Sequence, residues 1–240
     1  KHFMQFTEEY FKEGQVLLFD KPLNWTSFQL VNKARWLIRK TFKIKKIKVG
    51  HAGTLDPLAT GLLIICTGKF TKRIEEFMGQ EKEYTGTIVL GATTPSYDLE
   101  TEIDQTFSTE HLNDTFVKAT TAQFTGAIQQ QPPVFSALKK DGKRLYEFAR
   151  AGEEVEIPSR TVEISEFEIT RIELPEVDFR VRCSKGTYIR SLAHDFGKAL
   201  NSGGHLSALR RTKIGDFDVQ DATSLESFEA ALKQAETSNN

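Results

Sequence analysis

Residues 50–61 constrain the fold of this chain more than any other stretch. They read G-H-A-G-T-L-D-P-L-A-T-G, and an apolar run, L-L-I-I-C, follows at once at residues 62–66. Three glycines and one proline within twelve residues are typical of a fixed loop, and they disfavour a helix or a strand interior. The sequence therefore predicts a rigid loop directly before a buried strand.

Asp56 carries the one carboxylate of this loop. Pro57 fixes the backbone after it and favours an extended conformation at Asp56 itself. These residues alone leave two interpretations open. The loop presents the carboxylate for catalysis, or the carboxylate only caps its own backbone in an Asx-turn, which is the commoner role of an Asp-Pro pair.

Composition excludes several classes of protein. The chain has 240 residues, of which 39% are hydrophobic, as in ordinary globular proteins. The longest apolar run spans only residues 62–66 and no signal peptide is visible, so we expect no membrane segment and a cytoplasmic protein. Cys66 and Cys183 lie in apolar strand-like runs, which fits core residues in a reducing compartment. We expect a monomer.

No known metal or cofactor motif is present in the sequence. The five histidines lack the spacing of metal ligands, and the glycines form neither a P-loop nor a dinucleotide fingerprint. We therefore expect no metal and no cofactor.

Positive charge is concentrated in one segment although the net charge is −1. Residues 33–48 contain eight cations and no acid, whereas residues 216–240 contain six acids and one cation. This segregation favours one face that binds phosphates, and the alternative is a solvated helix face.

Helical and strand-like patterns alternate along the chain. Helices are predicted at residues 5–14, 71–78, 109–124 and 224–233, at a segment that begins at Thr26 or Ser27, and at a segment that Thr187 caps and that ends near Leu200. Strands are predicted at residues 15–20, 83–90, 161–174 and 177–183. Neither repeats nor linkers interrupt this pattern.

Residues 50–61 match every fixed position of G-H-x-G-x-L-D-P-x-A-x-G and so resemble the catalytic motif of the TruB family, the tRNA pseudouridine synthases that act on the T arm. S-K-G-T-Y-I-R at residues 184–190 resembles a second family motif. The resemblance implies an α+β pseudouridine synthase fold, with a mixed, mostly antiparallel sheet flanked by helices. It implies one domain over residues 1–240 with an RNA-binding thumb inserted at about 125–158, and this chain ends before a C-terminal PUA module.

Three catalytic residues are implied by the same resemblance. Asp56 is the catalytic aspartate, Tyr84 in the K-E-Y segment stacks on the target uracil, and Arg190 pairs with Asp56. Physical chemistry supports the pairing, since a cation in the first turn of a helix is repelled by the helix dipole and needs a partner. A neighbouring arginine also keeps a carboxylate ionised. The alternative is an arginine that points into solvent.

Substrate contacts are implied for His51, Tyr188, Lys21, Asp98 and Leu209. Lys21 opens a segment similar to K-P-x-G-x-T-S, in which Asn24 replaces the usual glycine and tolerates a left-handed backbone. Asp98 matches a T-x-T-x-D segment whose spacing is altered here. His51 would fill the place of a base that leaves the T-loop stack, or it is a hydrogen-bonded structural histidine.

RNA contacts are expected on three segments. Residues 129–146 resemble the P-P-x-x-S-A-x-x-x-x-G-x-R-x-Y stretch of the thumb, whose aromatic and basic residues suit unpaired bases and phosphates. The residues concerned are Lys139, Lys140, Lys143 and Arg144 there, Arg210 and Arg211 in an L-R-R-T element, and Lys45 and Lys46 in the basic segment.

The resemblance implies isomerisation of a T-loop uridine, at tRNA position 55, to pseudouridine. A tRNA-folding chaperone on the same scaffold is the alternative, although a protein that only binds RNA would have no need of Asp56, Tyr84 and Arg190. The catalytic subunit of a guide-RNA pseudouridylase is a third possibility, but those proteins are larger and carry the PUA module.

Overall fold

Two segments from opposite ends of the chain, Lys1–Lys82 and Arg210–Asn240, form one unit, and Glu83–Leu209 forms a second. The computed structural model describes residues 6–134, 139–140, 143–144, 147, 152 and 156–238. Each unit has its own core of buried apolar side chains.

Strand β3 (Ala59–Thr67) is the centre of the first unit. It pairs antiparallel with β1 (Gln15–Lys21) and with β2 (Val49–His51), and it also neighbours β12 (Gly204–Ile214), which begins in the second unit and ends in the first. β13 (Phe217–Asp218) pairs with the end of β12. Eight of the nine residues of β3 are buried, which confirms the predicted buried strand and indicates that both of its faces are covered.

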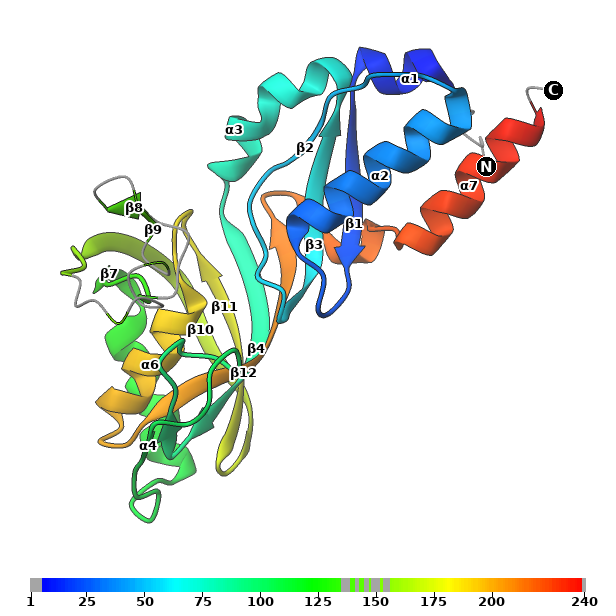
Figure 1. Cartoon of the computed structure of the whole chain (residues 1–240). Helices are drawn as coiled ribbons and strands as arrows, with labels where there is room; N and C mark the ends of the chain where they lie inside the picture. The colour runs from blue at the N-terminus through cyan, green and yellow to red at the C-terminus, as the bar shows by residue number, and fades with distance from the viewer. Residues whose placement is uncertain are drawn as a thin grey trace. The chain divides into compact units, whose positions relative to one another are not determined.

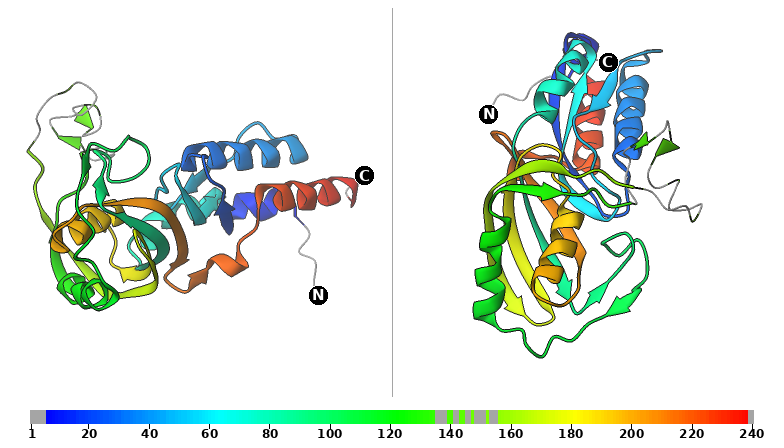
Figure 2. Two further views of the ribbon diagram at one scale, coloured as in Figure 1. Left: turned by 90° about the horizontal axis from the view of Figure 1, so that it is seen from below. Right: turned by 90° about the vertical axis from the view of Figure 1, so that its left-hand side faces the viewer.

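Helices α2 (Ser27–Phe42) and α7 (Leu225–Ser238) lie side by side in the first unit (Figure 1, Figure 2). Thr26, one of the two residues expected at the start of this helix, caps α2, since its hydroxyl accepts the Gln29 amide and the Gln29 side chain accepts the Thr26 amide. The buried face of α2 contains Leu30, Val31, Ala34, Leu37 and Ile38. The remaining helices of this unit are α1 (Glu8–Glu13), the 3-10 helices η1 (Gly68–Arg73) and η3 (Val219–Asp221), and α3 (Ile74–Met78).

The strands of the second unit follow the order β12-β4-β11-β10-β7. Their bounds are Lys82–Leu90 for β4, Glu176–Cys183 for β11, Arg160–Glu173 for β10 and Gly126–Gln130 for β7. β10 is antiparallel to both of its neighbours. Two short pairs complete the described strands: β5 (Ala92–Thr93) with β6 (Gln105–Thr106), and β8 (Lys139–Lys140) with β9 (Lys143–Arg144).

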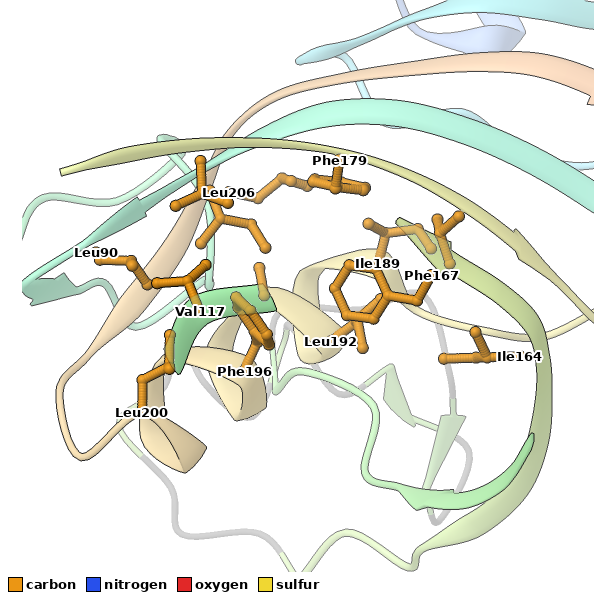
Figure 3. Close-up of a cluster of buried hydrophobic side chains, with 14 of the residues drawn as sticks. Leu90, Val117, Ile164, Phe167, Phe179, Ile189, Leu192, Phe196, Leu200 and Leu206 are labelled. Atoms are coloured by element: carbon orange, nitrogen blue, oxygen red, sulfur yellow. The ribbon is translucent and has the colours of Figure 1, made fainter. Parts of the chain in front are cut away.

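Helix α6 (Ile189–Ala199) packs its apolar face against this sheet. Ile189, Leu192 and Phe196 of α6 meet Phe167 of β10 and Phe179 of β11 in one buried cluster (Figure 3). α4 (Asp114–Thr120) adds Val117 to the cluster, and the 3-10 helix η2 (Thr121–Phe124) follows it. This core fixes the position of α6, which carries Arg190. Together the two units confirm the expected α+β class.

Two local predictions differ from the structure, and a third lies partly outside the described residues. The helix predicted over residues 109–124 begins only at Asp114, because the Asn113 side chain accepts the Phe116 amide and caps it there. Thr187 does not cap α6, since its hydroxyl donates to the Ser184 carbonyl. The predicted thumb, residues 125–158, includes β7, β8 and β9, and the rest of it lies in part outside the described residues.

Candidate active site

Asp56 lies in the loop between β2 and β3, and the main chain on each side of it is held by a residue from another segment. The Leu55 amide donates to the Ser27 hydroxyl at 2.9 Å, and that hydroxyl donates to the Leu55 carbonyl at 3.2 Å. The Asn24 amide donates to the Pro57 carbonyl at 2.7 Å. The shape of the loop is therefore fixed by main-chain contacts on both sides of the half-buried Asp56.

Arg211 of β12 fixes the two ends of the same loop. Its guanidinium donates from Nε to the Leu62 carbonyl at 2.9 Å and from Nη2 to the Gly53 carbonyl at 3.1 Å. Gly61 has φ +108°, and a Cβ at this position would stand 2.2 Å from the Arg211 carbonyl oxygen. Only glycine allows β12 to approach this closely. The guanidinium is buried, so Arg211 supports the loop from inside the protein, and its predicted contact with RNA stays a prediction.

Lys21 is buried and belongs to the same charged cluster as Asp56 and Arg211. Its Nζ donates to the carbonyls of Pro22 and Trp25 at 3.0 and 2.6 Å. Burial lowers the pKa of Lys21 to about 8, Asp56 opposes this shift, and Arg211 adds to it. The ammonium is thus a buried positive charge that interacts electrostatically with the predicted catalytic carboxylate.

The imidazole of His51 lies at the end of β2, just before the Asp56 loop. Burial and the nearby Arg211 lower the pKa of His51, and a hydrogen bond with the Gly53 main chain partly opposes this. Nδ1 is buried and has no hydrogen-bond partner in the described part of the chain. The contact of His51 with a nucleotide stays a prediction.

A cavity of about 370 Å³ opens beside Lys21 and Trp25 in the first unit. Arg210 lines it and forms a bidentate pair with Asp20, with N–O distances of 3.0 and 2.8 Å. The sequence placed Arg210 among the RNA contacts, and the pair with Asp20 was not foreseen. Adjacent residues of β12 point to opposite faces of the sheet. This explains why Arg210 lines the cavity whereas Arg211 is buried.

Arg190 lies in the first turn of α6 in the second unit, and its side chain is buried. Its Nη1 donates to the Ser96 carbonyl at 3.4 Å. The predicted ion pair between Arg190 and Asp56, which belong to different units, stays a prediction.

Asp98 is buried in a loop at residues 94–101, which we call the Asp98 loop. The Asp98 carboxylate accepts the Ser96 hydroxyl at 2.6 Å and the Glu100 amide at 2.9 Å. The Ser96 hydroxyl also contacts Thr101 Oγ1 at 2.7 Å. These bonds give Asp98 a role inside its own loop, because it holds the segment whose Ser96 carbonyl contacts Arg190.

Tyr84, Leu209 and Tyr188 are three further residues of the predicted site in the second unit. Tyr84 and Leu209 are half-buried and pack against the cluster shown in Figure 3. The main chain of Tyr188 exchanges hydrogen bonds of 2.8 and 3.0 Å with the Gln130 side chain, and the Arg160 guanidinium lies 4.8 Å from its ring centroid. Tyr188 is therefore held in place, with its ring under a cation.

A cavity of about 350 Å³ in the first unit is lined by five lysines. We call it the lysine pocket, and its basic residues are Lys12, Lys46, Lys48, Lys69 and Lys72. Lys12 and Lys69 pair with glutamates of α1, whereas Lys46, Lys48 and Lys72 form no ion pair within the residues that the structure describes. Lys45, also predicted to bind RNA, is exposed next to it. Lys139, Lys140, Lys143 and Arg144 form the β8–β9 pair.

Neither a metal site nor a membrane span is found among the described residues. In that part of the chain no three His, Cys, Asp or Glu side chains are grouped as metal ligands are. None of the helices there has the length and apolar character needed to cross a bilayer.

Comparison with known proteins identifies the family of this chain. The family model described as TruB family pseudouridylate synthase (N terminal domain) matches residues 39–189, and the tRNA pseudouridylate synthase B C-terminal domain matches residues 190–240. A Flavobacterium johnsoniae protein named tRNA pseudouridine synthase B is 68% identical over 95% of this chain and 100% of its own length. A Phocaeicola vulgatus protein of the same name is 60% identical over 94% of this chain and 96% of its own length.

Solved structures support the expected pseudouridine synthase fold. A chain in the crystal structure of a Cbf5-Nop10-Gar1 complex superposes with a TM-score of 0.69 at 30% identity, over 93% of this chain. This chain spans 55% of that longer relative. The family models, the relatives and the fold agree, and the chain therefore belongs to the TruB family of pseudouridylate synthases.

Proposed function

We propose that this chain converts the uridine at position 55, in the T loop of tRNA, into pseudouridine, with Asp56 as the catalytic carboxylate. The family models and the relatives named tRNA pseudouridine synthase B support an isomerase that acts on uridine in tRNA, and they favour an enzyme over a folding chaperone. The choice of the T loop and the roles of the individual residues rest on the motifs and the local geometry.

The reaction exchanges one glycosidic bond for another. The C1′–N1 bond breaks, the uracil turns, and a C1′–C5 bond forms, while the proton lost from C5 is balanced by one gained at N1. No oxidant or energy source is consumed. The step needs an ionised carboxylate held near the sugar and the base, and a base that has left its stack.

The observation that carries this proposal is the support of the Asp56 loop. Ser27, Asn24 and Arg211 hold its main chain through the hydrogen bonds described above. Because the loop is fixed from outside, its shape does not require the Asp56 carboxylate as an internal cap. This favours presentation of the carboxylate to a substrate over the Asx-turn interpretation.

The proposal also gives roles to the residues around Asp56. Lys21 interacts electrostatically with both Asp56 and Arg211, so the Asp56 carboxylate belongs to a cluster that contains two cations. In our proposal Arg190 pairs with Asp56. Tyr84 stacks on the flipped uracil, Tyr188 and Leu209 line its binding site, and His51 occupies the place that the base leaves.

The lysine pocket supports the RNA side of the proposal. Lys46, Lys48 and Lys72 place three ammonium groups around one cavity, without a carboxylate partner in the described part of the chain. Clustered lysines without acids attract a phosphate backbone. We propose that this pocket and the β8–β9 segment hold the T arm, that the protein acts as a monomer, and that it works in the cytoplasm.

The test is release of tritium from tRNA labelled at uracil C5. The wild-type chain should release label from the T-loop uridine, and Asp56→Asn should release none while still binding tRNA. Asp216→Asn is the matched control, because Asp216 is exposed in the same unit and the substitution is identical. Equal release from the wild type and Asp56→Asn would remove Asp56 from catalysis, and tRNA refolding without release by the wild type would favour the chaperone.

A further inference from the structure

Two rings from distant parts of the second unit stack face to face. The ring centroids of Tyr97, in the Asp98 loop, and His194, on α6, lie 3.9 Å apart with an interplanar angle of 16°. Both side chains are half-buried. Because the stack joins the loop to the helix, it restrains the loop at one defined point of α6.

Tyr97 occupies an unusual backbone conformation. Its φ is +66°, in the left-handed region that bulky side chains rarely adopt. Its amide donates to the Thr94 carbonyl at 3.1 Å, and its own carbonyl accepts the Leu206 amide at 2.8 Å. Asparagine or glycine would fit this backbone more easily than tyrosine. We infer that the contact of the Tyr97 ring with His194 compensates for the backbone strain.

His194 supplies the second ring of the stack. Its buried Nδ1 lacks a hydrogen-bond partner in the described residues. Burial and the cation of Lys198 lower the pKa of His194, while Asp104 opposes this shift, so the imidazole is neutral at neutral pH. The contact with Tyr97 is therefore a stack of two neutral rings.

The stack lies next to the hydrogen bond that joins Arg190 to the Asp98 loop. His194 follows Arg190 by four positions on α6, so the two side chains project from one face of the helix. On the loop, Tyr97 directly follows Ser96, whose carbonyl accepts Arg190 Nη1 at 3.4 Å. Two adjacent loop residues thus contact two helix residues one turn apart.

We propose that Tyr97 and His194 are positioning residues for Arg190. The stack keeps the Ser96 carbonyl at the guanidinium, and this contact sets the direction in which the guanidinium points. The inference rests on the proposed function, in which Arg190 pairs with the catalytic carboxylate. Loss of the stack frees the Asp98 loop and broadens the range of guanidinium orientations, without removing any group that contacts RNA.

The first experiment compares Tyr97→Asn with Tyr97→Phe in single-turnover tritium release. Asparagine tolerates the left-handed backbone, so this variant removes the ring without adding strain. We expect Tyr97→Asn to lower the single-turnover rate constant by about ten- to a hundredfold, the scale that a misplaced catalytic group produces, with an unchanged dissociation constant for tRNA. Tyr97→Phe keeps the ring and should stay within about twofold of the wild type. His194→Asn and His194→Phe should behave in the same way.

The second experiment asks whether Tyr97 acts through Arg190. In an Arg190→Lys background the fork-shaped donor is gone, so Tyr97→Asn should lower the rate by no more than about twofold further. His111→Ala is the matched control, because His111 contacts the Leu200 carbonyl at 2.7 Å, at the other end of α6. His111→Ala perturbs α6 at the end that is distant from Arg190, so the single-turnover rate should stay within about threefold of the wild type.

Three outcomes separate the possibilities. A wild-type rate for Tyr97→Asn, together with an inactive Asp56→Asn, would overturn the positioning role and leave the proposed function intact. The same loss of rate in the wild-type and Arg190→Lys backgrounds would also overturn it, because Tyr97 would then act independently of Arg190. Full activity of Asp56→Asn would instead refute the proposed function itself.

Discussion

The Ser27 hydroxyl and the main chain of Leu55 exchange two hydrogen bonds, with N–O and O–O distances of 2.9 and 3.2 Å. Ser27 is the first residue of α2, and Leu55 directly precedes Asp56. A single side chain therefore connects the start of α2 to the main chain next to Asp56. Because Ser27 is buried, water does not replace the bonds when the hydroxyl is removed.

Ser27→Ala should separate turnover from binding. It leaves two buried main-chain groups of Leu55 without a partner, which should lower the free energy of unfolding by about 1–3 kcal/mol. The loop then loses one of its supports, so we expect the single-turnover rate to fall at least tenfold while tRNA affinity changes little. Tritium release, tRNA binding and urea denaturation measure these effects. Ser227→Ala, at an exposed serine of α7, is the control, and equal effects of both variants would contradict the role of Ser27.

Gly61→Ala should destabilise the first unit through a steric clash. The added Cβ would stand 2.2 Å from the Arg211 carbonyl, and the backbone has φ +108°. Gly126→Ala is a matched control, because Gly126 has φ +96° with no atom within 4 Å of the added Cβ. Gly126→Ala should lower the free energy of unfolding only by the backbone strain, about 1 kcal/mol. Gly61→Ala should lower it clearly more, because the clash adds to the strain. Similar urea midpoints for the two variants would show that β12 can move aside.

Lys21 should make the free energy of unfolding increase with pH in the alkaline range. Its pKa is about 8 in the folded protein and 10.5 in the unfolded chain, so the unfolded chain binds more protons between these values. Stability should therefore rise as pH increases from 8 to 10.5, by on the order of 2 kcal/mol after allowance for solvent screening. Lys21→Met should remove this rise, and Lys233→Met, at an exposed lysine, should retain it. Urea denaturation across this pH range measures the difference.

Asp195→Asn should stabilise the protein at neutral pH. Burial raises the pKa of Asp195 from 3.8 to about 6, and Lys198 opposes the shift. The folded protein therefore binds more protons than the unfolded chain between pH 3.8 and 6, and the stability contribution of Asp195 falls as pH rises through this window. Above about pH 6 the free energy of unfolding of the variant should exceed that of the wild type by about 1–2 kcal/mol in urea denaturation. This value allows for partial screening of the carboxylate by solvent. The gain should vanish near about pH 4, and a gain that persists there would contradict this origin.

Sequence alone predicted the elements that depend on local chemistry. The apolar run after the loop forms β3, Thr26 caps α2, and Asn24 adopts φ +67°, as expected for an asparagine in place of glycine. The helix before β7 was predicted too long, because the spacing of its apolar residues gave no sign that Asn113 would cap it.

The contacts between distant residues could not be read in the same way. The motifs named Asp56 and Arg190, but they did not reveal that Ser27 and Arg211 hold the loop, or that Arg210 binds Asp20. Tyr97 and His194 lie far apart in the sequence, and neither carries a pattern of its own. Such contacts depend on how the elements pack, and local propensity carries no information about that.

Arg211 shapes residues that come 149 and 158 positions before it in the chain. Asp56 therefore leaves the ribosome long before the side chain that supports its loop has been made. Until Arg211 has been made, Asp56 lies on a segment without its final geometry, because contacts this distant in sequence form only once the intervening chain has closed.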